Sequence, residues 1–510
     1  MVKLSSTDRS FLRALSDLTY CNQFSAERIE LEKRALCDQY LPEPITSWSR
    51  TADTDRLERP NVQRITDRAN ETVERLYDKQ GVDGSLRGDE AELYHDLVTY
   101  VLYYRHVAVL SREAIQPGAR HAQVRASWRS FRGERERMLE RLNAADRRRM
   151  PSSEHAFAVL HQVRRAFLWI FDCFIGVSLP ATRLRASVWE SIFTHDMRRY
   201  QRALYNRMGD FATLVTGPSG AGKELVAQAI ARSQYRPFDG RAEALAGDGE
   251  DFLALNLTAL SPTLIESELF GHRRGAFTGA DADRVGWLER CPPHGAVFLD
   301  EIGELDATVQ VKLLRVAQSR DYSRLGESEV RRFIGKLLAA TNRDLAEEMR
   351  AGRFREDLYY RLCSDRVVVP SLHEQIADRP EVLGTLIKFL AARVLGDADD
   401  VEVGPLSEEV LAFIERDLPT GYEWPGNIRE LDQCVRSVLL RRAYNPPRRE
   451  APSADRPAWI IRAEAGDLTA DELLNAYCRH VHSKQGGYEP AARLLGLDRR
   501  TVKNRVVNDP

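Results

Sequence analysis

The first third of the chain carries a helical pattern of apolar positions. Apolar residues recur every three or four positions, which predicts amphipathic helices packed into a bundle. One stripe, from Leu93 to Tyr104, is typical of a bundle core. No glycine-punctuated alternation of strands and helices occurs here, so a phosphoacceptor receiver domain is not expected. The predicted helices are residues 7–20, 25–40, 61–80, 89–115, 124–150 and 153–177.

Between about residues 187 and 444 the pattern changes to short apolar runs that alternate with helical stretches. The apolar runs at 212–216, at 296–299 and at the start of 336–344 predict buried strands. Alternation of this kind is typical of a mostly parallel sheet with helices on both faces. The patterns therefore predict a multidomain fold, with an all-α N-terminal region and a central α/β domain.

The end of the chain again predicts short helices. Residues 444–457 have the proline and charge content of a linker. Thr469 and Glu472 have the spacing of a capping box that opens a helix. Two further helices flank a turn at Gly496, the second capped by Asp498, which suits a helix-turn-helix.

Length and composition indicate a globular protein of several domains. A chain of 510 residues is expected to hold about three or four domains. Because the net charge is only −2, any basic surface that binds nucleic acid is expected to be a local patch. The seven cysteines form no CxxC pair, which favours reduced thiols over a disulfide framework. The first residues do not resemble a signal peptide. The apolar stretch 166–179 is too short to span a membrane. We therefore expect a cytoplasmic protein with no membrane partner.

A glycine-rich turn follows the first predicted strand of the central region. It reads GPSGAGK and fits the phosphate-binding pattern G-x-x-x-x-G-K, in which backbone N–H groups and a helix N-terminus surround phosphate oxygens. Lys223 would reach the β- and γ-phosphates, while Glu224 stands where Ser or Thr usually holds magnesium. The candidate ATP-binding residues here are Gly217, Pro218, Ser219, Gly220, Ala221, Gly222, Lys223 and Glu224.

Polar residues end two other predicted strands. Asp300 and Glu301 follow an apolar run, at the edge where parallel sheets place their ligands. Asp300 would hold Mg²⁺, and Glu301 would orient and activate the attacking water. Asn342 ends the next strand and is placed to touch the γ-phosphate or that water. These residues predict an ATPase site that uses ATP and Mg²⁺.

An unusual loop lies between the glycine-rich turn and the two carboxylates. We interpret it as a hairpin tip that grips a partner through its aromatic side chain; a core phenylalanine in a turn is the alternative. Its residues are Gly275, Ala276, Phe277, Thr278, Gly279 and Ala280.

About half of the chain resembles the AAA+ activators of sigma-54 RNA polymerase, the bacterial enhancer-binding proteins. The hexapeptide GAFTGA is that family's signature for contact with the sigma factor. A phosphate-binding loop that ends in GKE is also usual in that family. The segments PSLHEQ and DRP, at 370–375 and 378–380, depart from the family's usual sequence. The resemblance continues through ALNLTAL, LDEIGEL, VKLLRV, ATNRDL, GRFREDLYYRL and WPGNIREL.

The resemblance implies roles for further residues. Asn256 matches the asparagine that pairs with the catalytic glutamate and relays the nucleotide state to the loop, and Asn342 resembles the first sensor. Arg355 and Arg361 match catalytic arginines offered to the neighbouring subunit's nucleotide. Arg429 resembles the second sensor, which binds ATP from a helical lid. Without the resemblance, these arginines would be interpreted as surface ion pairs.

The last residues resemble the Fis-type DNA-binding end of the same family. The segment AARLLGLDRRTVKNRV would place a basic helix in the major groove; a basic helical hairpin that binds no DNA is the alternative. The candidate DNA-binding residues are Arg499, Arg500, Thr501, Lys503, Asn504 and Arg505.

The resemblance implies an activator that binds double-stranded DNA, assembles into a ring expected to be a hexamer, and remodels the closed complex of sigma-54 RNA polymerase. A non-enzymatic DNA-binding repressor and an AAA+ remodeller with another client are the rival classes. The expected domains are an all-helical regulatory region at 1–184, an α/β ATPase subdomain at 185–380, a helical lid at 381–445, a linker at 446–467 and a helix-turn-helix at 468–510.

The first third offers weaker candidates. The arginine-dense stretch 129–149 is interpreted as a solvated mixed-charge helix rather than a nucleic-acid contact. His155, His161 and Cys173 are interpreted as core and surface residues of one helix rather than as ligands of a metal or haem. The signal that this region senses does not follow from the sequence.

Overall fold

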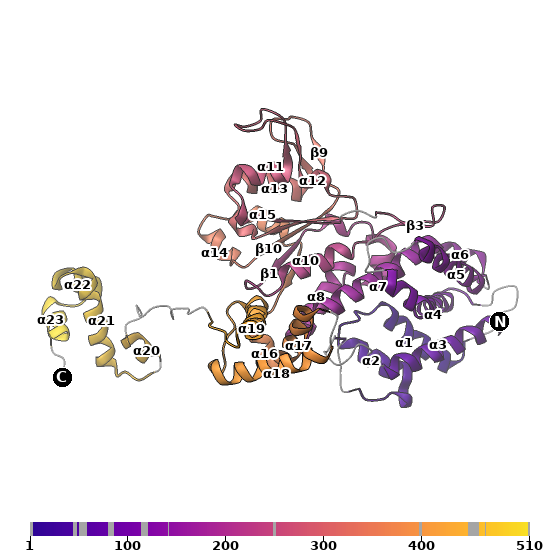
Figure 1. Ribbon diagram of the computed structural model, residues 1–510, viewed down its shortest axis with the longest axis horizontal. Helices are drawn as coiled ribbons and strands as arrows, with labels where there is room; N and C mark the ends of the chain where they lie inside the picture. The colour runs from indigo at the N-terminus through magenta and orange to yellow at the C-terminus, as the bar shows by residue number, and fades with distance from the viewer. Residues whose placement is uncertain are drawn as a thin grey trace. The chain divides into compact units, whose positions relative to one another are not determined.

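The fold is described from a computed structural model, which is drawn in Figure 1. The chain divides into two compact units, Met1–Ala443 and Tyr444–Pro510. Each unit is described by itself. The described residues are 4–43, 48–49, 59–79, 86–113, 121–140, 142–247, 251–396, 400–446, 458–464 and 466–507.

The N-terminal region is helical, as predicted. Its apolar side chains form one core around α4, which packs against α1, α3, α5 and α7. The predicted helix 124–150 is wrong in one respect: it breaks before Asn143, whose side chain accepts a hydrogen bond from Asp146 N–H and so starts a new helix. The helices are α1 Ser6–Tyr20, α2 Glu27–Leu36, the 3₁₀ turn Cys37–Gln39, α3 Pro60–Lys79, α4 Asp89–Glu113, α5 His121–Leu139, α6 Ala144–Arg149 and α7 Ser153–Cys173.

The central region is the predicted parallel α/β domain. Among the described residues, its main sheet has the strand order β11-β1-β10-β7-β4, and every neighbouring pair is parallel. Three short antiparallel pairs accompany it. The strands of the main sheet are β1 Thr213–Thr216, β4 Phe252–Asn256, β7 Ala296–Asp300, β10 Lys336–Thr341 and β11 Asp365–Val368. The short pairs are β2 Phe238–Asp239 with β3 Ala244–Leu245, β5 Gly271–His272 with β6 Arg284–Val285, and β8 Asp321–Tyr322 with β9 Arg331–Arg332.

Alternate strand residues face two separate layers of helices. Val215, Phe298 and Leu338 pack with α8 and α10, whereas Leu214 and Leu337 pack with α11, α13 and α15. Both faces are therefore buried, as expected for a parallel sheet. The helices are α8 Leu179–Phe193, α9 Met197–Arg199, the π-helical turn Tyr200–Leu204, the 3₁₀ turn Met208–Asp210, α10 Lys223–Arg232, the 3₁₀ turn Leu257–Ala259, α11 Pro262–Phe270, α12 Trp287–Arg290, the 3₁₀ turn Ile302–Glu304, α13 Ala307–Ser319, α14 Leu345–Arg350 and α15 Glu356–Leu362.

The helical N-terminal region and the α/β domain pack together within the first unit. Helix α7 lies against α10, the helix that follows the glycine-rich turn (Figure 1). The Gln162 amide donates to Ser233 O at 2.8 Å, and the Arg165 guanidinium donates to Gln234 O, both just beyond the end of α10. These buried bonds tie the N-terminal region directly to the helix that carries Lys223.

Four helices follow the sheet and form a lid. The departing segment PSLHEQ folds as a helix with a capping box, in which Ser371 and Glu374 exchange side-chain and backbone hydrogen bonds. The lid helices, orange in Figure 1, are α16 Leu372–Asp378, α17 Glu381–Leu395, α18 Asp400–Asp417 and α19 Asn427–Arg441.

The second unit is a small helical domain. The capping box of Thr469 and Glu472 is confirmed, as is the Asp498 cap, which accepts a hydrogen bond from Arg500 N–H at 2.7 Å. Gly496 ends the helix before the cap with a φ of 64°. In the part of the chain that the structure describes, no helix is long and apolar enough to cross a membrane. The helices of this unit are α20 Ala458–Glu464, α21 Ala470–Gln485, α22 Tyr488–Leu495 and α23 Arg499–Val507.

Candidate nucleotide site

The glycine-rich turn connects β1 to α10 in the way that a phosphate-binding loop requires. Gly217, Gly220 and Gly222 all have positive φ angles, which side chains other than glycine rarely adopt. Lys223, the first residue of α10, donates from Nζ to Gly217 O at 3.1 Å and to Pro218 O at 3.3 Å. Burial lowers the pKa of this lysine, so a phosphate beside it would favour its charged form.

The two carboxylates stand at the carboxyl end of β7, beside this loop. Asp300 is the last residue of the strand, and Asn256 lies opposite it at the end of β4. Glu301 follows with a left-handed backbone; its carboxylate accepts a hydrogen bond from Asn342 N–H at 3.2 Å and lies 3.9 Å from Lys223 Nζ. The Asn256 side-chain oxygen accepts hydrogen bonds from the N–H and hydroxyl of Thr258.

One cavity of about 540 Å³ gathers most of the predicted site residues. Thr258, Gln228, Leu225 and Glu304 also line it, and the sequence patterns did not single them out. Three predicted residues of the loop, Gly217, Pro218 and Ala221, lie outside its lining. The predicted residues that line it are Ser219, Gly220, Gly222, Lys223, Glu224, Asn256, Asp300, Glu301, Asn342 and Arg429.

The donor set of this cavity fits a magnesium–nucleotide complex. Asp300, Glu301 and Glu224 offer the carboxylate oxygens that Mg²⁺ prefers. Lys223, the N-terminus of α10 and Arg429 supply positive charge for phosphates.

The lid reaches the phosphate-binding loop through α19. The Asn427 amide donates to Ser219 O at 2.9 Å, and its oxygen accepts from Leu372 N–H at 2.8 Å. Gly220 packs so closely on Gly426 that an added Cβ would come within 2.2 Å of the Gly426 carbonyl oxygen. Asn427 had no predicted role, although its place in WPGNIREL, two residues before Arg429, was a signal.

Arg355 and Arg361 lie outside this cavity, on α15 and at its start. Both are exposed, and Arg355 pairs with Asp357 at 2.7 Å. The backbone N–H of Arg355 donates to Gln310 on α13 at 2.8 Å, which holds the start of α15 against the domain. Within one chain these arginines therefore do not complete the site that holds Lys223.

The GAFTGA loop connects β5 to β6. Gly275 N–H donates to Ala280 O at 2.9 Å, and Ala280 N–H donates to Phe277 O at 3.0 Å, so the loop closes on itself. Thr278 is exposed, and the half-buried Phe277 ring lies 4.9 Å from the His272 ring. Phe277 is thus not a core residue of the domain.

A single arginine clamps this loop to the neighbouring hairpin. The Arg273 guanidinium pairs with Asp283 on its own loop and with Glu327 on the loop between β8 and β9, both at 2.6 Å. Leu325 of the second loop exchanges backbone hydrogen bonds with Gly271 and Arg273. The two loops therefore form one connected structure.

Most of the predicted DNA-binding residues lie on the open face of α23. Arg505 is the exception: it donates to Asn475 at 2.9 Å and pairs with Asp471 at 3.2 Å, both on α21. Thr501 is half-buried. The exposed residues are Arg499, Arg500, Lys503 and Asn504.

The histidines of α7 are packing residues. His155 bonds Tyr235 OH and Gln201 O, each at 2.9 Å. Burial of His161, together with the nearby positive charge of Arg165, lowers its pKa to about 3. Within the described ranges, no cluster of three His, Cys, Asp or Glu side chains could hold a metal ion.

A parallel sheet with a phosphate-binding loop, strand-end carboxylates and a helical lid at one cavity defines a P-loop nucleotide-binding domain. Residues 192–367 match the family model described as the sigma-54 interaction domain. Over these residues the central region is therefore similar to the sigma-54 interaction domain.

More than half of the chain is similar to curated proteins. Over 292 residues the chain is 39% identical to the transcriptional regulatory protein ZraR of Escherichia coli K12, covering 57% of this chain and 61% of ZraR. Over 300 residues it is 38% identical to the Nif-specific regulatory protein of Azotobacter vinelandii, covering 58% and 53%. The chain thus spans less than two thirds of the length of either relative. A solved structure, NtrX from Brucella abortus, has a TM-score of 0.38 at 25% identity, covering 69% of this chain and 72% of NtrX.

Proposed function

We propose that this protein is a sigma-54-dependent transcriptional activator that couples ATP hydrolysis to opening of the polymerase–promoter complex. The observation that carries the proposal is a single cavity, within a region similar to the sigma-54 interaction domain, that gathers Lys223, Asp300, Glu301 and Asn342. The relatives ZraR and the Nif-specific regulator are named as regulatory proteins, which agrees with this assignment.

Different residues of the cavity have different roles in the proposed hydrolysis of ATP. The loop N–H groups and Lys223 would bind the β- and γ-phosphates, and Asp300 and Glu224 would hold magnesium. When bound, the metal would neutralise negative charge on the phosphates. Glu301, held by Asn342 N–H, orients a water and accepts its proton.

Completion of the site requires a second copy of the chain. Arg355 and Arg361 are exposed on α15, outside their own cavity, and we assign them to the γ-phosphate of the neighbouring subunit in a ring. An arginine supplied in trans makes hydrolysis depend on assembly. A hexamer is the expected ring, and the exposed basic residues of α23 would hold it to double-stranded DNA in the bacterial cytoplasm.

The GAFTGA loop would transmit the conformational change that follows ATP hydrolysis to the polymerase. Asn256 stands beside Asp300 at the strand ends and would relay the state of the nucleotide toward the loop. The exposed Thr278 and the half-buried Phe277 would bind sigma-54.

Replacement of Thr278 by Ala tests this assignment against an AAA+ remodeller with another client. We expect ATP turnover to remain, and ATP-dependent opening of a sigma-54 promoter in vitro to fall by about tenfold or more. Thr308→Ala, at an exposed threonine of the same domain, is the control and should open promoters normally. Normal promoter opening by Thr278→Ala would contradict the assignment of Thr278 to contact with sigma-54. A wild type that hydrolyses ATP but opens no sigma-54 promoter would favour the remodeller with another client. No turnover by the wild type would favour the repressor class instead.

A further inference from the structure

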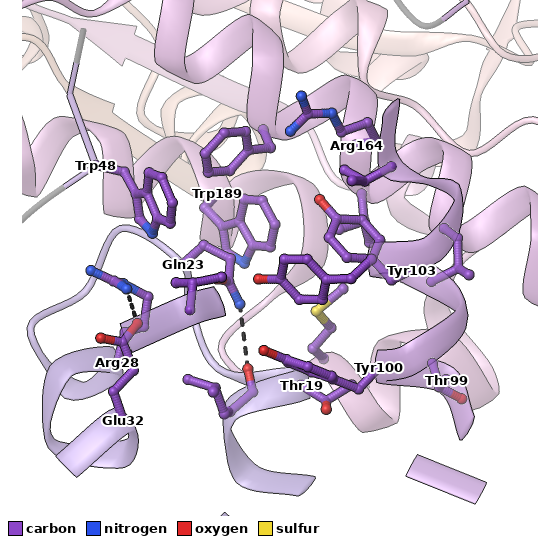
Figure 2. Close-up of a pocket in the computed structure, with 18 of the residues that line it drawn as sticks. Thr19, Gln23, Arg28, Glu32, Trp48, Thr99, Tyr100, Tyr103, Arg164 and Trp189 are labelled. Carbon is purple, nitrogen blue, oxygen red and sulfur yellow. Dashed lines mark hydrogen bonds and ion pairs between the residues drawn. The ribbon is translucent and has the colours of Figure 1, made fainter. Parts of the chain in front are cut away.

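A second cavity lies inside the helical N-terminal region. It has a volume of about 140 Å³ and is lined by residues of α1–α4 and α7–α9 and of the neighbouring turns. Figure 2 shows the rings of Trp48, Trp189, Tyr100 and Tyr103 standing around it. A closed apolar cavity of about 150 Å³ can accept a benzene molecule. The space therefore suits one aromatic ring.

The rings of the wall brace one another, so the cavity is preformed. The ring of Phe167 lies edge-on to that of Trp48, with 5.3 Å between their centres. The ring of Tyr104 lies 4.7 Å from that of Tyr100 and 5.1 Å from that of Tyr103. Protein interiors contain few voids larger than a water molecule. A braced cavity of this size therefore gives up packing contacts that a ligand would restore.

Two tyrosines indicate that this wall faces an internal space rather than bulk solvent. Tyr103 and Tyr104 are half-buried, so both side chains keep accessible surface. Burial nevertheless raises the pKa of both hydroxyl groups. The surface that these side chains keep therefore lies toward the cavity, which both residues line.

The charged groups of the wall already have partners. Arg28 and Glu32 are buried and pair with each other, one turn apart on α2. Arg164 bonds the Tyr103 hydroxyl and lies over the Phe167 ring, 5.5 Å from its centre. A charged ligand would lose its hydration here without gaining a free countercharge, which is costly. The cavity therefore favours an uncharged ligand.

One polar side chain of the wall makes only long hydrogen bonds. The Gln23 amide donates to Leu18 O and to Cys21 O, each at 3.4 Å, whereas such bonds are usually about 2.7–3.2 Å long. A hydroxyl group of a ligand could accept a shorter hydrogen bond from this amide.

We propose that the N-terminal region is a receptor for a small uncharged aromatic molecule, with its ring between the aromatic side chains and one polar substituent at Gln23. The ring fills the apolar volume and makes edge-to-face and stacked contacts with the wall. The substituent replaces the long hydrogen bonds of the Gln23 amide.

The same helices that line this cavity also contact the nucleotide-binding domain. Val163 and Phe167 of α7 line the cavity, while Gln162 and Arg165 of the same helix bond the backbone just beyond α10. Trp189 of α8 lines the cavity and shares a core with α10. Occupancy of the cavity would therefore act on α10 through α7 and α8. This regulatory part of the inference rests on the proposed ATPase function.

Calorimetric titration of the full chain tests the binding with three probes of similar size. They are benzyl alcohol, its saturated analogue cyclohexylmethanol and the charged benzoate ion. We expect benzyl alcohol to bind with a Kd of about 1 mM, as befits so small a ligand. Benzoate should bind at least about tenfold more weakly because its charge finds no free partner. Cyclohexylmethanol should bind about threefold or more weakly because it makes no ring–ring contacts.

Two variants fill the cavity from different helices. Val163→Phe on α7 and Val62→Phe on α3 each place a ring at a half-buried valine of the wall, and each should weaken the binding of benzyl alcohol by about tenfold or more. Val330→Phe, at an exposed valine outside the N-terminal region, is the control and should bind as the wild type does. A melting temperature for each variant separates lost binding from lost folding.

Three outcomes would overturn the proposal. They are no binding of benzyl alcohol by the wild type up to about 30 mM, undiminished binding by the two cavity-filling variants, and binding of benzoate or cyclohexylmethanol as tight as that of benzyl alcohol. The first and third outcomes are read on the wild type alone, so they decide the proposal even where a variant fails to fold.

ATP turnover with and without benzyl alcohol tests the coupling separately. A change of turnover in the wild type but not in Val163→Phe supports it. Binding with unchanged turnover would overturn the coupling and leave the receptor site standing. A chain that hydrolyses no ATP under either condition would defeat the proposed function, while the titration still decides the site.

Discussion

Glu301 was predicted from the sequence to activate the attacking water, but its left-handed backbone conformation was not predicted. Its φ and ψ of 58° and 51° are left-handed, which costs a residue with a side chain about 1–2 kcal/mol. The hydrogen bond from Asn342 N–H stabilises this arrangement and directs the carboxylate toward Lys223. Backbone strain of this kind is typical of functional sites, where it fixes a side chain in its working position.

Replacement of Glu301 by Gln tests its role as the base. The amide keeps the shape of the side chain but cannot accept a proton, so we expect ATP turnover to fall by about 10² or more while nucleotide binding persists. Steady-state turnover and equilibrium nucleotide titration measure the two effects. The exposed Glu347→Gln serves as the control, and turnover within about twofold of wild type in E301Q would contradict the assignment.

His161 makes the N-terminal region sensitive to acid. Burial lowers its pKa to about 3 in the folded chain, whereas an unfolded chain takes up the proton at about 6.5. Stability is therefore lost as the pH falls from about 6.5 toward 3, amounting to about 2 kcal/mol at pH 5.

A His161→Leu variant should lack this acid sensitivity. We expect its free energy of unfolding relative to wild type to increase by about 2 kcal/mol between pH 7.5 and pH 5, measured by denaturant unfolding of the full chain at each pH. A difference that is the same at both pH values would show that His161 binds its proton equally in both states.

At the scale of elements, the contact between lid and phosphate-binding loop controls the shape of the nucleotide site. Asn427 bonds both Ser219 and Leu372, so one side chain joins the lid, the loop and α16. Gly220 permits this approach because it lacks a Cβ. Arg429 comes from the lid, so this contact keeps its side chain in the lining of the nucleotide cavity.

Gly220→Ala should push the lid away. The new Cβ would meet the Gly426 carbonyl oxygen at 2.2 Å, so we expect nucleotide affinity to fall by about tenfold or more. Gly352→Ala is a matched control: its φ is also positive, 69°, but nothing lies within 4 Å of the added atom. Nucleotide titrations that gave equal affinities for the two variants would contradict the role of the contact.

Sequence patterns predicted most of the helices and strands, but they did not predict the contacts between the N-terminal helices and the α/β domain. The 3.6-residue period identified the N-terminal helices, but the break before Asn143 depends on one side-chain cap that periodicity does not register. The spacing of Lys223, Asp300 and Asn342 located the strand ends that form the site. The contact of α7 with α10 rests on donors such as Gln162 that reach a backbone 71 residues away, so no local pattern encodes it.

At the scale of the whole molecule, the proposed catalytic site would be completed between two copies of the chain. Arg355 lies outside the cavity that holds Lys223, and its exposed side chain pairs with Asp357. Cyclic symmetry would bring the cavity of one copy and Arg355 of the next together at every interface of a ring.

Mixing two inactive variants tests this arrangement. Lys223→Ala and Arg355→Ala should each lower turnover strongly on its own, the latter by about 10³ or more. Subunits of both kinds, combined at equal amounts, would pair one intact Lys223 with one intact Arg355 at roughly a quarter of the interfaces. We expect turnover to rise toward that fraction, and a mixture as inactive as its components would mean that Arg355 does not act in trans.

The rate of ATP hydrolysis by the purified full chain, measured per chain over a range of protein concentrations, tests the central claim most directly. The account predicts that the rate per chain rises with concentration to a plateau as rings form, and that Lys223→Ala removes it. Absence of hydrolysis at every concentration, or hydrolysis that persists in Lys223→Ala, would contradict the claim that this cavity is the site of an assembly-dependent ATPase.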